Sequence, residues 1–396
     1  MQGGDSVRPP PIWLLGAMPG VGVFASSIYL PSIPAMALDL QVPVAQIQFT
    51  VTAYLAAMAA SMLVIGPLSD RMGRRRIALW MLVLFMLGSV GSLLATDVHT
   101  LIAARLVQGA GASGGIVLSR SMLRDAFSDV EAVRAGASMS MSISLAPILA
   151  PMIGGLLQEA FGWRANMLLI VVMSLVLCGV TYSRMHETLP PEKRVAGPKV
   201  HMALGYAQLL RMRVFMAYSL PVAFGAAAIF AYQTEAPVLL IGTLHVSAAE
   251  YGIFGAMPAL GFIAGGFITR RLAGRVPRTM LMQLGCALCT LAGVVLTLLA
   301  LVMPLSALAI AAPMILFGMG NGIVMPNGGY GAMRAAPAMI GASAALSSCM
   351  RMGSGSLGSL MATALPDGSV LALGLLVTAG GLAAFLTWRL LGRGLD

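Results

Sequence analysis

The apolar positions of this chain fall in long continuous runs, separated by short stretches that contain charges or Gly, Pro, Asn and Asp. A helix needs about 20 mostly apolar residues to cross the hydrocarbon core of a bilayer, and roughly 12 runs reach that length. These runs lie near residues 12–36, 44–68, 77–96, 99–120, 134–158, 164–184, 214–241, 249–269, 279–301, 305–328, 338–364 and 369–391. The pattern therefore predicts a chain made of membrane-spanning helices.

One longer polar stretch, Met185–Arg213, interrupts the apolar runs and contains the sequence PPEKR at residues 190–194. Its composition is typical of a linker between two halves. We therefore expect an N-terminal six-helix bundle over residues 1–184, a cytoplasmic linker over 185–213 and a C-terminal six-helix bundle over 214–396.

A loop signature occurs in both halves, at GPLSDRMGRR over residues 66–75 and at GFITRRLAGR over residues 266–275. Gly, an aliphatic residue, a hydroxyl residue, Arg, an aliphatic residue and Arg recur at the same offsets. Transporters are commonly built from such repeats, with the substrate site near the midplane where the repeats meet. The second copy has Arg270 where the first has Asp70, so the two loops differ in charge. The sequence predicts an all-α membrane protein with roughly 12 transmembrane helices in two six-helix repeats.

Composition and charge support this fold class and give an orientation. Charged residues make up 10% of the chain, against about 25% in soluble domains, which excludes a cytosolic enzyme and a nucleic-acid-binding module. Of the 24 Lys and Arg residues, Arg105 and Arg351 lie inside spans and Arg164 lies in a loop on the outer side. The others gather on the opposite side, which the positive-inside rule makes cytoplasmic, together with both termini. The net charge of +10 therefore requires no nucleic acid as partner.

Four further motifs lie in the predicted spans: YLPSIP at residues 29–34, RLVQGAG at 105–111, APILAPMIGG at 146–155 and GWR at 162–164. With the loop at residues 66–76 they resemble the major facilitator superfamily, and specifically a drug:proton antiporter of the Bcr/CflA type. The resemblance covers nearly the whole chain, with Ala150 where the antiporter motif usually has Gly. It implies the major facilitator fold and multidrug efflux from a bacterial-type inner membrane, by alternating access in exchange for protons.

The first loop signature suggests a gate. Its arginines alone can be ordinary positive-inside anchors. The carboxylate of Asp70 can cap a helix N-terminus or pair with an arginine. Its possible partners are Arg120 or Arg124 at the end of the fourth span, or the start of the eleventh span in the other half. Gly73 permits a tight turn between the charges. In the resembled family such contacts hold the cytoplasmic side shut. The resemblance therefore implies a gating role for Asp70, Arg71, Gly73, Arg74 and Arg124.

The fifth span carries Pro147 and Pro151, each of which removes a backbone hydrogen bond and bends the helix. The nearby Gly154 and Gly155 let a neighbouring helix approach closely. A kinked packing helix explains these residues without any transport. The resemblance to antiporters implies in addition that this close contact seals the bundle against leak.

Three charged residues lie well inside the predicted spans: Arg105, Glu235 and Arg351. A charge at membrane depth costs about 2.5–3.5 kcal/mol, so each needs a partner or a water-filled cavity. Arg105 and Glu235 lie at similar depth, which fits either a fixed ion pair or proton exchange at Glu235. Exporters of the resembled type usually have an acid two residues before the Tyr-Leu-Pro of span 1, where this chain has Ser27. We therefore predict proton coupling at Glu235 with Arg105, and transport without protons remains an alternative.

Arg351 lies near the midplane, about 20 Å along the eleventh span, too deep for its side chain to reach the interface. Two arginines against one glutamate predict a small amphipathic substrate that is neutral or anionic, with Arg351 bonding its polar group. A brace of Arg351 by carbonyl groups or by Glu235 is the alternative. Aromatic and amide residues are expected to line the substrate site, although each can equally be helix packing. These residues are Tyr29, Tyr54, Gln108, Phe230, Tyr232, Gln233 and Asn327.

No metal, cofactor or catalytic site is expected. Cys286 and Cys289 have the spacing of metal ligands but lie in a predicted span without a second pair. The absence of clustered catalytic groups at membrane depth disfavours an enzyme, and the duplicated halves disfavour a receptor-like sensor. A metabolite or sugar exporter or uniporter of the same fold remains an alternative. We expect a monomer in a lipid bilayer that handles protons and a small amphipathic substrate.

Overall fold

The computed structural model describes residues 9–127, 129–194, 200–364 and 369–395, and most of them are helical. The N-terminal half contains α1 (Ile12–Ser27), η1 (Leu30–Ser32), α2 (Ile33–Asp39), α3 (Val44–Met72), α4 (Arg74–Leu93), α5 (Val98–Ala126), α6 (Asp129–Phe161) and α7 (Trp163–Arg184). The connecting segment contains η2 (Pro191–Lys193) and α8 (Val200–Arg211). The C-terminal half contains α9 (Arg213–Pro237), η3 (Val238–Thr243), α10 (Ala248–Leu272), α11 (Arg278–Val302), α12 (Ala307–Ala335), η4 (Pro337–Met339), α13 (Ile340–Thr363) and α14 (Val370–Leu391).

Within the described residues, 11 helical segments are long and apolar enough to cross a membrane. One of them joins α1, η1 and α2, and another joins α9 and η3. The helix α13 occupies the place of the predicted eleventh span and has 24 residues, but its many Ser and Gly residues make it less apolar. The helices are compatible with 12 spans and confirm the prediction of an all-α membrane protein.

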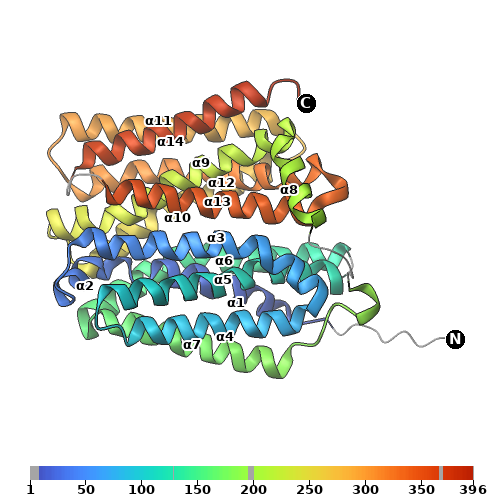
Figure 1. The fold of residues 1–396 in the computed structure, drawn as a ribbon. Coiled ribbons are helices and arrows are strands. Elements are labelled where there is room, and N and C mark those ends of the chain that lie inside the picture. The colour runs from blue at the N-terminus through green and yellow to red at the C-terminus, as the bar shows by residue number, and fades with distance from the viewer. Residues whose placement is uncertain (1–8, 128, 195–199, 365–368, 396) are drawn as a thin grey trace.

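The long helices form two bundles that lie side by side, α1–α7 and α9–α14 (Figure 1). Across the interface α3 packs on α13 and α6 packs on α10, and one hydrophobic core continues from Tyr54 to Tyr232. We call the end where α1 begins and α14 ends the terminal end, and the opposite end the distal end. Because successive long helices run antiparallel, α3, α5 and α10 begin at the distal end.

Prolines interrupt the first and seventh spans, which the sequence predicts as continuous helices. Pro31 and Pro34 lack backbone donors, and there α1 gives way to the turn η1 and then to α2. Pro237 ends α9, and the chain continues as the π-helix η3. Both interruptions lie toward the distal end.

Side-chain caps fix helix starts at the distal end. Asp97 and Ser247 accept hydrogen bonds from the backbone N–H groups three residues further along, at the starts of α5 and α10. Hydrogen bonds from the Thr100 hydroxyl and backbone lower the pKa of Asp97, so this cap stays charged at neutral pH.

The segment between the bundles, predicted as a polar linker, contains the helix α8. Figure 1 shows α8 at the terminal end, running across the bundles rather than along them. The Tyr206 hydroxyl donates a hydrogen bond to the Leu63 carbonyl of α3 over 3.2 Å. Burial raises the pKa of Tyr206, which keeps this donor protonated. Residues 195–199 of the predicted linker lie outside the described residues.

The two copies of the loop signature make different turns. In the first copy only Gly73, at φ 95°, separates α3 from α4. In the second copy the left-handed residue is Gly274, at φ 78°, and α11 does not begin until Arg278. The repeat in sequence therefore ends in a helix-to-helix junction in one half and in a longer turn in the other.

Candidate functional site

Arg105 lies in the interior of the N-terminal bundle, in the distal half of α5, and is fully buried. Its guanidinium carbon lies 4.3 Å from the ring centre of Tyr29 and 4.3 Å from that of Tyr54. A cation over an aromatic face is attracted by the negative charge of that face. The hydroxyl of Tyr54 donates to the Gly22 carbonyl over 2.8 Å, which fixes the ring. Two of the predicted substrate-lining residues therefore enclose Arg105.

Hydrogen bonds satisfy only part of the Arg105 guanidinium. Nη1 donates to Gln108 Oε1 and, over 3.3 Å, to the Ala25 carbonyl. Nε and Nη2 are buried without a hydrogen-bond partner, and no ion pair among the described residues involves Arg105. Ser27 lies in the same turn of α1 as Ala25, at the position where the family resemblance implies an acid. With serine at that position, the guanidinium keeps two unsatisfied donors.

Glu235 is buried near the distal end of α9, with 2% of its surface exposed. Gln48 of α3 donates from Nε2 to Glu235 Oε2 over 2.9 Å and to the Thr234 carbonyl over 3.0 Å. Since α3 belongs to the other bundle, these bonds cross the interface. The π-helix η3 follows three residues later, and such turns often occur at functional sites. Glu235 is therefore a buried acid placed at the contact between the two halves.

Hydroxyl groups extend this contact along the interface. Thr52 of α3 donates to Ser359 Oγ over 2.9 Å and accepts at its carbonyl from Ser356 Oγ over 3.0 Å. Thr234 also donates to Ser359 Oγ, over 2.8 Å. We call this set the distal seam; it consists of Gln48, Thr52, Thr234, Glu235, Ser356 and Ser359.

Gly154 and Gly155 of α6 lie at two different interfaces. A Cβ on Gly155 would overlap the carbonyl of Ala248, the first residue of α10 in the other bundle. A Cβ on Gly154 would overlap the carbonyl of Ile28, in the same bundle. The predicted close approach thus serves the contact between halves at Gly155 and the packing inside one half at Gly154. Pro147 and Pro151 lie within α6, in the stretch before the two glycines.

Arg351 lies about midway along α13 and is half-buried. No hydrogen bond or ion pair of its guanidinium occurs in the described part of the chain, including the predicted brace by Glu235. Arg120 of α5 donates to Ser348 of α13 over 3.3 Å, three residues before Arg351, so the two arginines approach the same stretch of α13. The sequence places Arg120 at the end of the fourth span, but α5 continues to Ala126, so Arg120 lies within the helix.

The remaining predicted lining residues come from the C-terminal bundle. Tyr232 is fully buried and its hydroxyl has no hydrogen-bond partner among the described residues, while Gln233 is half-buried. The Phe230 ring fills the space beside Gly355 of α13, which is helix packing. Asn327 donates to a carbonyl of its own helix over 2.8 Å. The structure therefore gathers Tyr29, Tyr54 and Gln108 around Arg105. The four lining residues of the C-terminal bundle do not belong to that group.

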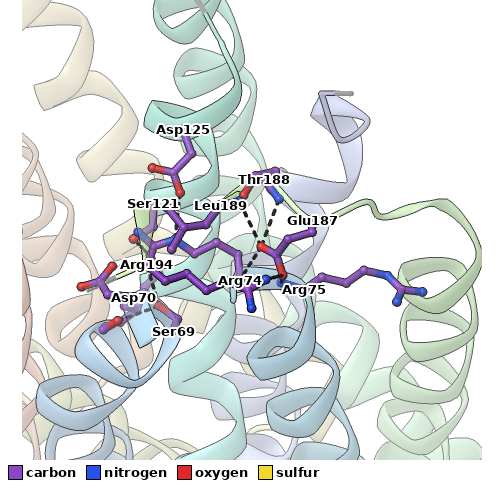
Figure 2. A network of polar contacts seen from close by, with 12 residues as sticks. Ser69, Asp70, Arg74, Arg75, Ser121, Asp125, Glu187, Thr188, Leu189 and Arg194 are labelled. Carbon is purple, nitrogen blue, oxygen red and sulfur yellow. Dashed lines mark hydrogen bonds and ion pairs between the residues drawn. The ribbon is translucent and has the colours of Figure 1, made fainter. Parts of the chain in front are cut away.

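Arg74 is the centre of a polar cluster at the terminal end (Figure 2). Its Nη1 lies 2.6 Å from Asp70 Oδ1, and its Nε lies 2.8 Å from Asp125 Oδ2. The arginine is buried, and its two carboxylates come from α3 and α5. Asp70 thus pairs with Arg74, and the suggested partners Arg120 and Arg124 form no ion pair with it in the described residues.

Glu187, in the segment after α7, caps the start of α4 (Figure 2). Its Oε1 accepts from the backbone N–H of Arg74 over 2.8 Å, and its Oε2 accepts from that of Arg75 over 3.3 Å. A carboxylate at a helix N-terminus is stabilised by the helix dipole. Gly73 permits this approach, since a Cβ there would overlap Glu187 Oε2. The capping role, which the sequence offered to Asp70 as one option, belongs to Glu187.

Arg71 lies beside this cluster in the last turn of α3, and Arg124 is exposed near the end of α5. Three polar partners were not singled out from the sequence: Gln48, Asp125 and Glu187. Gln48 lies in an apolar run two residues after Gln46, and the sequence does not show which of the two amides makes the buried contact. Asp125 and Glu187 lie at span ends, where the pattern does not separate a bonded charge from a solvated one.

The described residues contain no group of three or more His, Cys, Asp or Glu side chains that could hold a metal ion. Cys286 and Cys289 are both buried and free.

Comparisons with known proteins agree with the motifs. Residues 18–359 match the family described as "Major Facilitator Superfamily". Multidrug resistance protein D of Escherichia coli K12 is 33% identical over 377 residues, covering 95% of this chain and 94% of the relative. A bicyclomycin resistance protein homolog of Haemophilus influenzae is 28% identical over 360 residues, covering 90% of this chain and 89% of the relative.

Solved structures show the same fold. A crystal structure of the peptide transporter POT in complex with alafosfalin aligns with a TM-score of 0.77, covering 99% of this chain and 97% of that one. Its sequence identity is 14%, so this likeness concerns the fold alone. The chain belongs to the Major Facilitator Superfamily, a family of membrane transporters, as its Bcr/CflA-type motifs predict.

Proposed function

We propose that this protein exports small amphipathic compounds, neutral or anionic, across a bacterial inner membrane in exchange for protons. The names of its relatives support drug efflux, since two of them are a multidrug and a bicyclomycin resistance protein. The fold supports alternating access, in which two bundles rock against each other around a central site. The alignments cover 94% and 89% of the length of these relatives.

The observation that carries proton coupling is the position of Glu235 in the distal seam. A buried carboxylate in a membrane protein is costly when charged, so its proton affinity depends on its surroundings. Gln48, which donates to Glu235, belongs to the other bundle. Opening of the seam breaks this bond and brings water to the acid. Protonation and conformation are therefore linked at this residue. Arg105, at a similar depth in the N-terminal bundle, adds a positive charge to the same half of the membrane.

The distribution of charge supports a cytoplasmic terminal end. Arg74, Arg213, Arg278 and Arg389 lie at helix ends there. At the distal end Arg164 forms an ion pair with Asp39 over 2.8 Å. By the positive-inside rule the terminal end faces the cytoplasm, with both termini, and the distal seam faces outward.

In the proposed cycle the cluster around Arg74 acts as a gate element at the cytoplasmic end. Asp70, Arg74 and Asp125 tie α3, α4 and α5 together, so these helices move as one body. Arg71, Gly73 and Arg124 belong to the same end of the bundle. We assign them a supporting role in this element.

A second candidate, a metabolite or sugar exporter or a uniporter of the same fold, is favoured by one observation. The first span has Ser27 where the resembled exporters have an acid, and Arg105 beside that turn has no carboxylate partner in the described residues. A chain without that acid lacks one group that could carry a proton, which favours transport without proton coupling.

Flux in proteoliposomes, with and without a pH gradient, separates the two candidates. We expect the wild type to accumulate radiolabelled chloramphenicol, a neutral amphipathic probe, only when a gradient is imposed. Glu235→Gln keeps the hydrogen bond to Gln48 but holds no exchangeable proton, so it should equilibrate the probe without accumulating it. Glu250→Gln is the matched control, because a capping box at that position accepts Gln as well as Glu. Accumulation by Glu235→Gln would refute the assignment, and gradient-independent flux in the wild type would favour the uniporter.

A further inference from the structure

Two arginines from opposite bundles lie close together in the terminal half of the interface. Arg120 of α5 donates from Nη1 to Ser348 Oγ of α13 over 3.3 Å. Ser348 and Arg351 are three residues apart on α13, so they lie on neighbouring positions of one helix face. One side chain from each half thus reaches the same short stretch of α13.

Neither arginine has an acidic partner among the residues that the structure describes. No ion pair in the described residues involves Arg120 or Arg351, and the guanidinium of Arg351 forms no hydrogen bond there. Both side chains are half-buried. The residue one turn further along α5 is Arg124, another cation. Positive charge therefore accumulates at this place without an acidic ion-pair partner in the described part of the chain.

Uncompensated like charges at membrane depth are unfavourable, and a bound anion relieves both the repulsion and the unsatisfied donors. A guanidinium offers five N–H donors in a planar fork that matches a carboxylate or sulfonate. Arg105 does not offer the same site, because it is enclosed by two tyrosine rings inside one bundle. The pair at Arg120 and Arg351 has one arm on each bundle, as expected for a substrate contact that changes during rocking.

We propose that Arg120 and Arg351 together bind the anionic group, a carboxylate or sulfonate, of an amphipathic substrate. This inference rests on the proposed function and adds a preference within its substrate class, for anionic over neutral compounds. Arg351 acts from the C-terminal bundle and Arg120 from the N-terminal bundle. The apolar part of the substrate remains between the helices, while the anion holds the two halves together at the terminal end.

Binding of matched probes to the purified protein in phosphatidylcholine vesicles tests this site. The probes are radiolabelled 1-naphthylacetate and 1-naphthylacetamide, which have the same ring and differ in charge. We expect the acetate to bind wild type about 10-fold tighter or more, as charge-assisted hydrogen bonds require. Arg120→Gln and Arg351→Gln should each bring the acetate to the affinity of the amide without changing amide binding. Arg351→Lys, which keeps the charge, and Arg334→Gln, at an exposed arginine on α12, should keep most of the preference.

The amide serves as the folding control, since a misfolded variant loses both probes. Equal affinity for both probes in the wild type, or an unchanged preference in Arg120→Gln and Arg351→Gln, would overturn the anion site. Displacement of the acetate by phosphatidylglycerol in the vesicles would assign the site to a lipid headgroup and overturn its assignment to a transported compound. None of these results depends on the proton gradient, so failure here is distinguishable from failure of chloramphenicol accumulation.

Discussion

The contact between α6 and α10 offers a single-atom test of the distal interface. In Gly155→Ala the added Cβ would stand 2.7 Å from the carbonyl carbon of Ala248 and 3.0 Å from Ala249 Cα. Ordinary contacts of side-chain carbons begin near 3.4 Å, and the Ala248 carbonyl oxygen would overlap the new methyl group more closely still, so the two helices must separate by about 1 Å or more. The methyl group therefore acts against the conformation in which the distal end is closed.

Overpacking of this kind typically costs about 1–3 kcal/mol. A cost of about 2 kcal/mol corresponds to a shift of about 30-fold in the ratio of closed to open distal ends. The same displacement lengthens the hydrogen bond from Ala249 N–H to Glu159 Oε1, now 2.8 Å. Because the overlap exists only when α6 meets α10, the fold of each bundle should stay intact. Efflux should slow, since every cycle has to pass through the closed distal end.

Electron–electron resonance distances between spin labels at Leu38 and Leu305 report on this end, with the four native cysteines replaced. Both positions are exposed, one in each bundle. We expect Gly155→Ala to move the population toward longer distances. Gly154→Ala provides the contrast, because its Cβ meets Ile28 within one bundle in every conformation and should lower thermal stability without changing the distances. Gly179→Ala, with open space around it, should leave both unchanged. A wild-type distance distribution in Gly155→Ala would refute this reasoning.

Two further predictions concern the terminal end. Asp70→Asn removes the ion pair with Arg74 but leaves the apolar spans intact, so we expect normal membrane insertion by immunoblot and loss of efflux; normal efflux would contradict the gate. Glu187→Gln removes the charge that caps α4 and should cost about 1 kcal/mol, seen as a melting midpoint lower by a few degrees. Glu192→Gln, at an exposed acid nearby, is the control, and an equal shift in both variants would contradict the cap.

Much of the fold follows from the sequence because the bilayer imposes length and apolarity on each span. The departures occur where another force determines the backbone. Proline chemistry breaks the first span at η1, and α13 spans the bundle with Ser and Gly residues because protein rather than lipid contacts much of its surface. The helix α8 is not predicted, because the polar composition of residues 185–213 indicates a linker. In the structure its Tyr206 hydroxyl donates a hydrogen bond to α3.

The candidate site was only partly predictable. The sequence singled out Arg105, Glu235 and Arg351 from the cost of burying charge. Arg105 and Glu235 are buried, whereas Arg351 is half-buried and its guanidinium has no ion pair in the described residues. It did not identify their neighbours, because those depend on how each helix is rotated and how far it extends. Gln48 meets Glu235 only since α3 turns that face toward α9. Arg120 lies inside α5 only since the helix continues past the apolar run to Ala126.

The helix α13 connects the two proposed functional contacts. Its distal half carries Ser356 and Ser359, which bond across the distal seam to Thr52, and its middle carries Ser348 and Arg351, which face Arg120. If α13 moves as a rigid helix, separation from α3 at its distal half also changes its distance from α5 nearer the terminal end. An anion held by Arg120 and Arg351 then favours one arrangement of the seam, and the protonation of Glu235 favours one as well. Coupling between two binding sites is reciprocal. If the bound anion changes the proton affinity of Glu235 by some factor, protonation of Glu235 must change the affinity for the anion by the same factor. Exchange of one for the other across the membrane therefore needs no contact between Glu235 and the substrate.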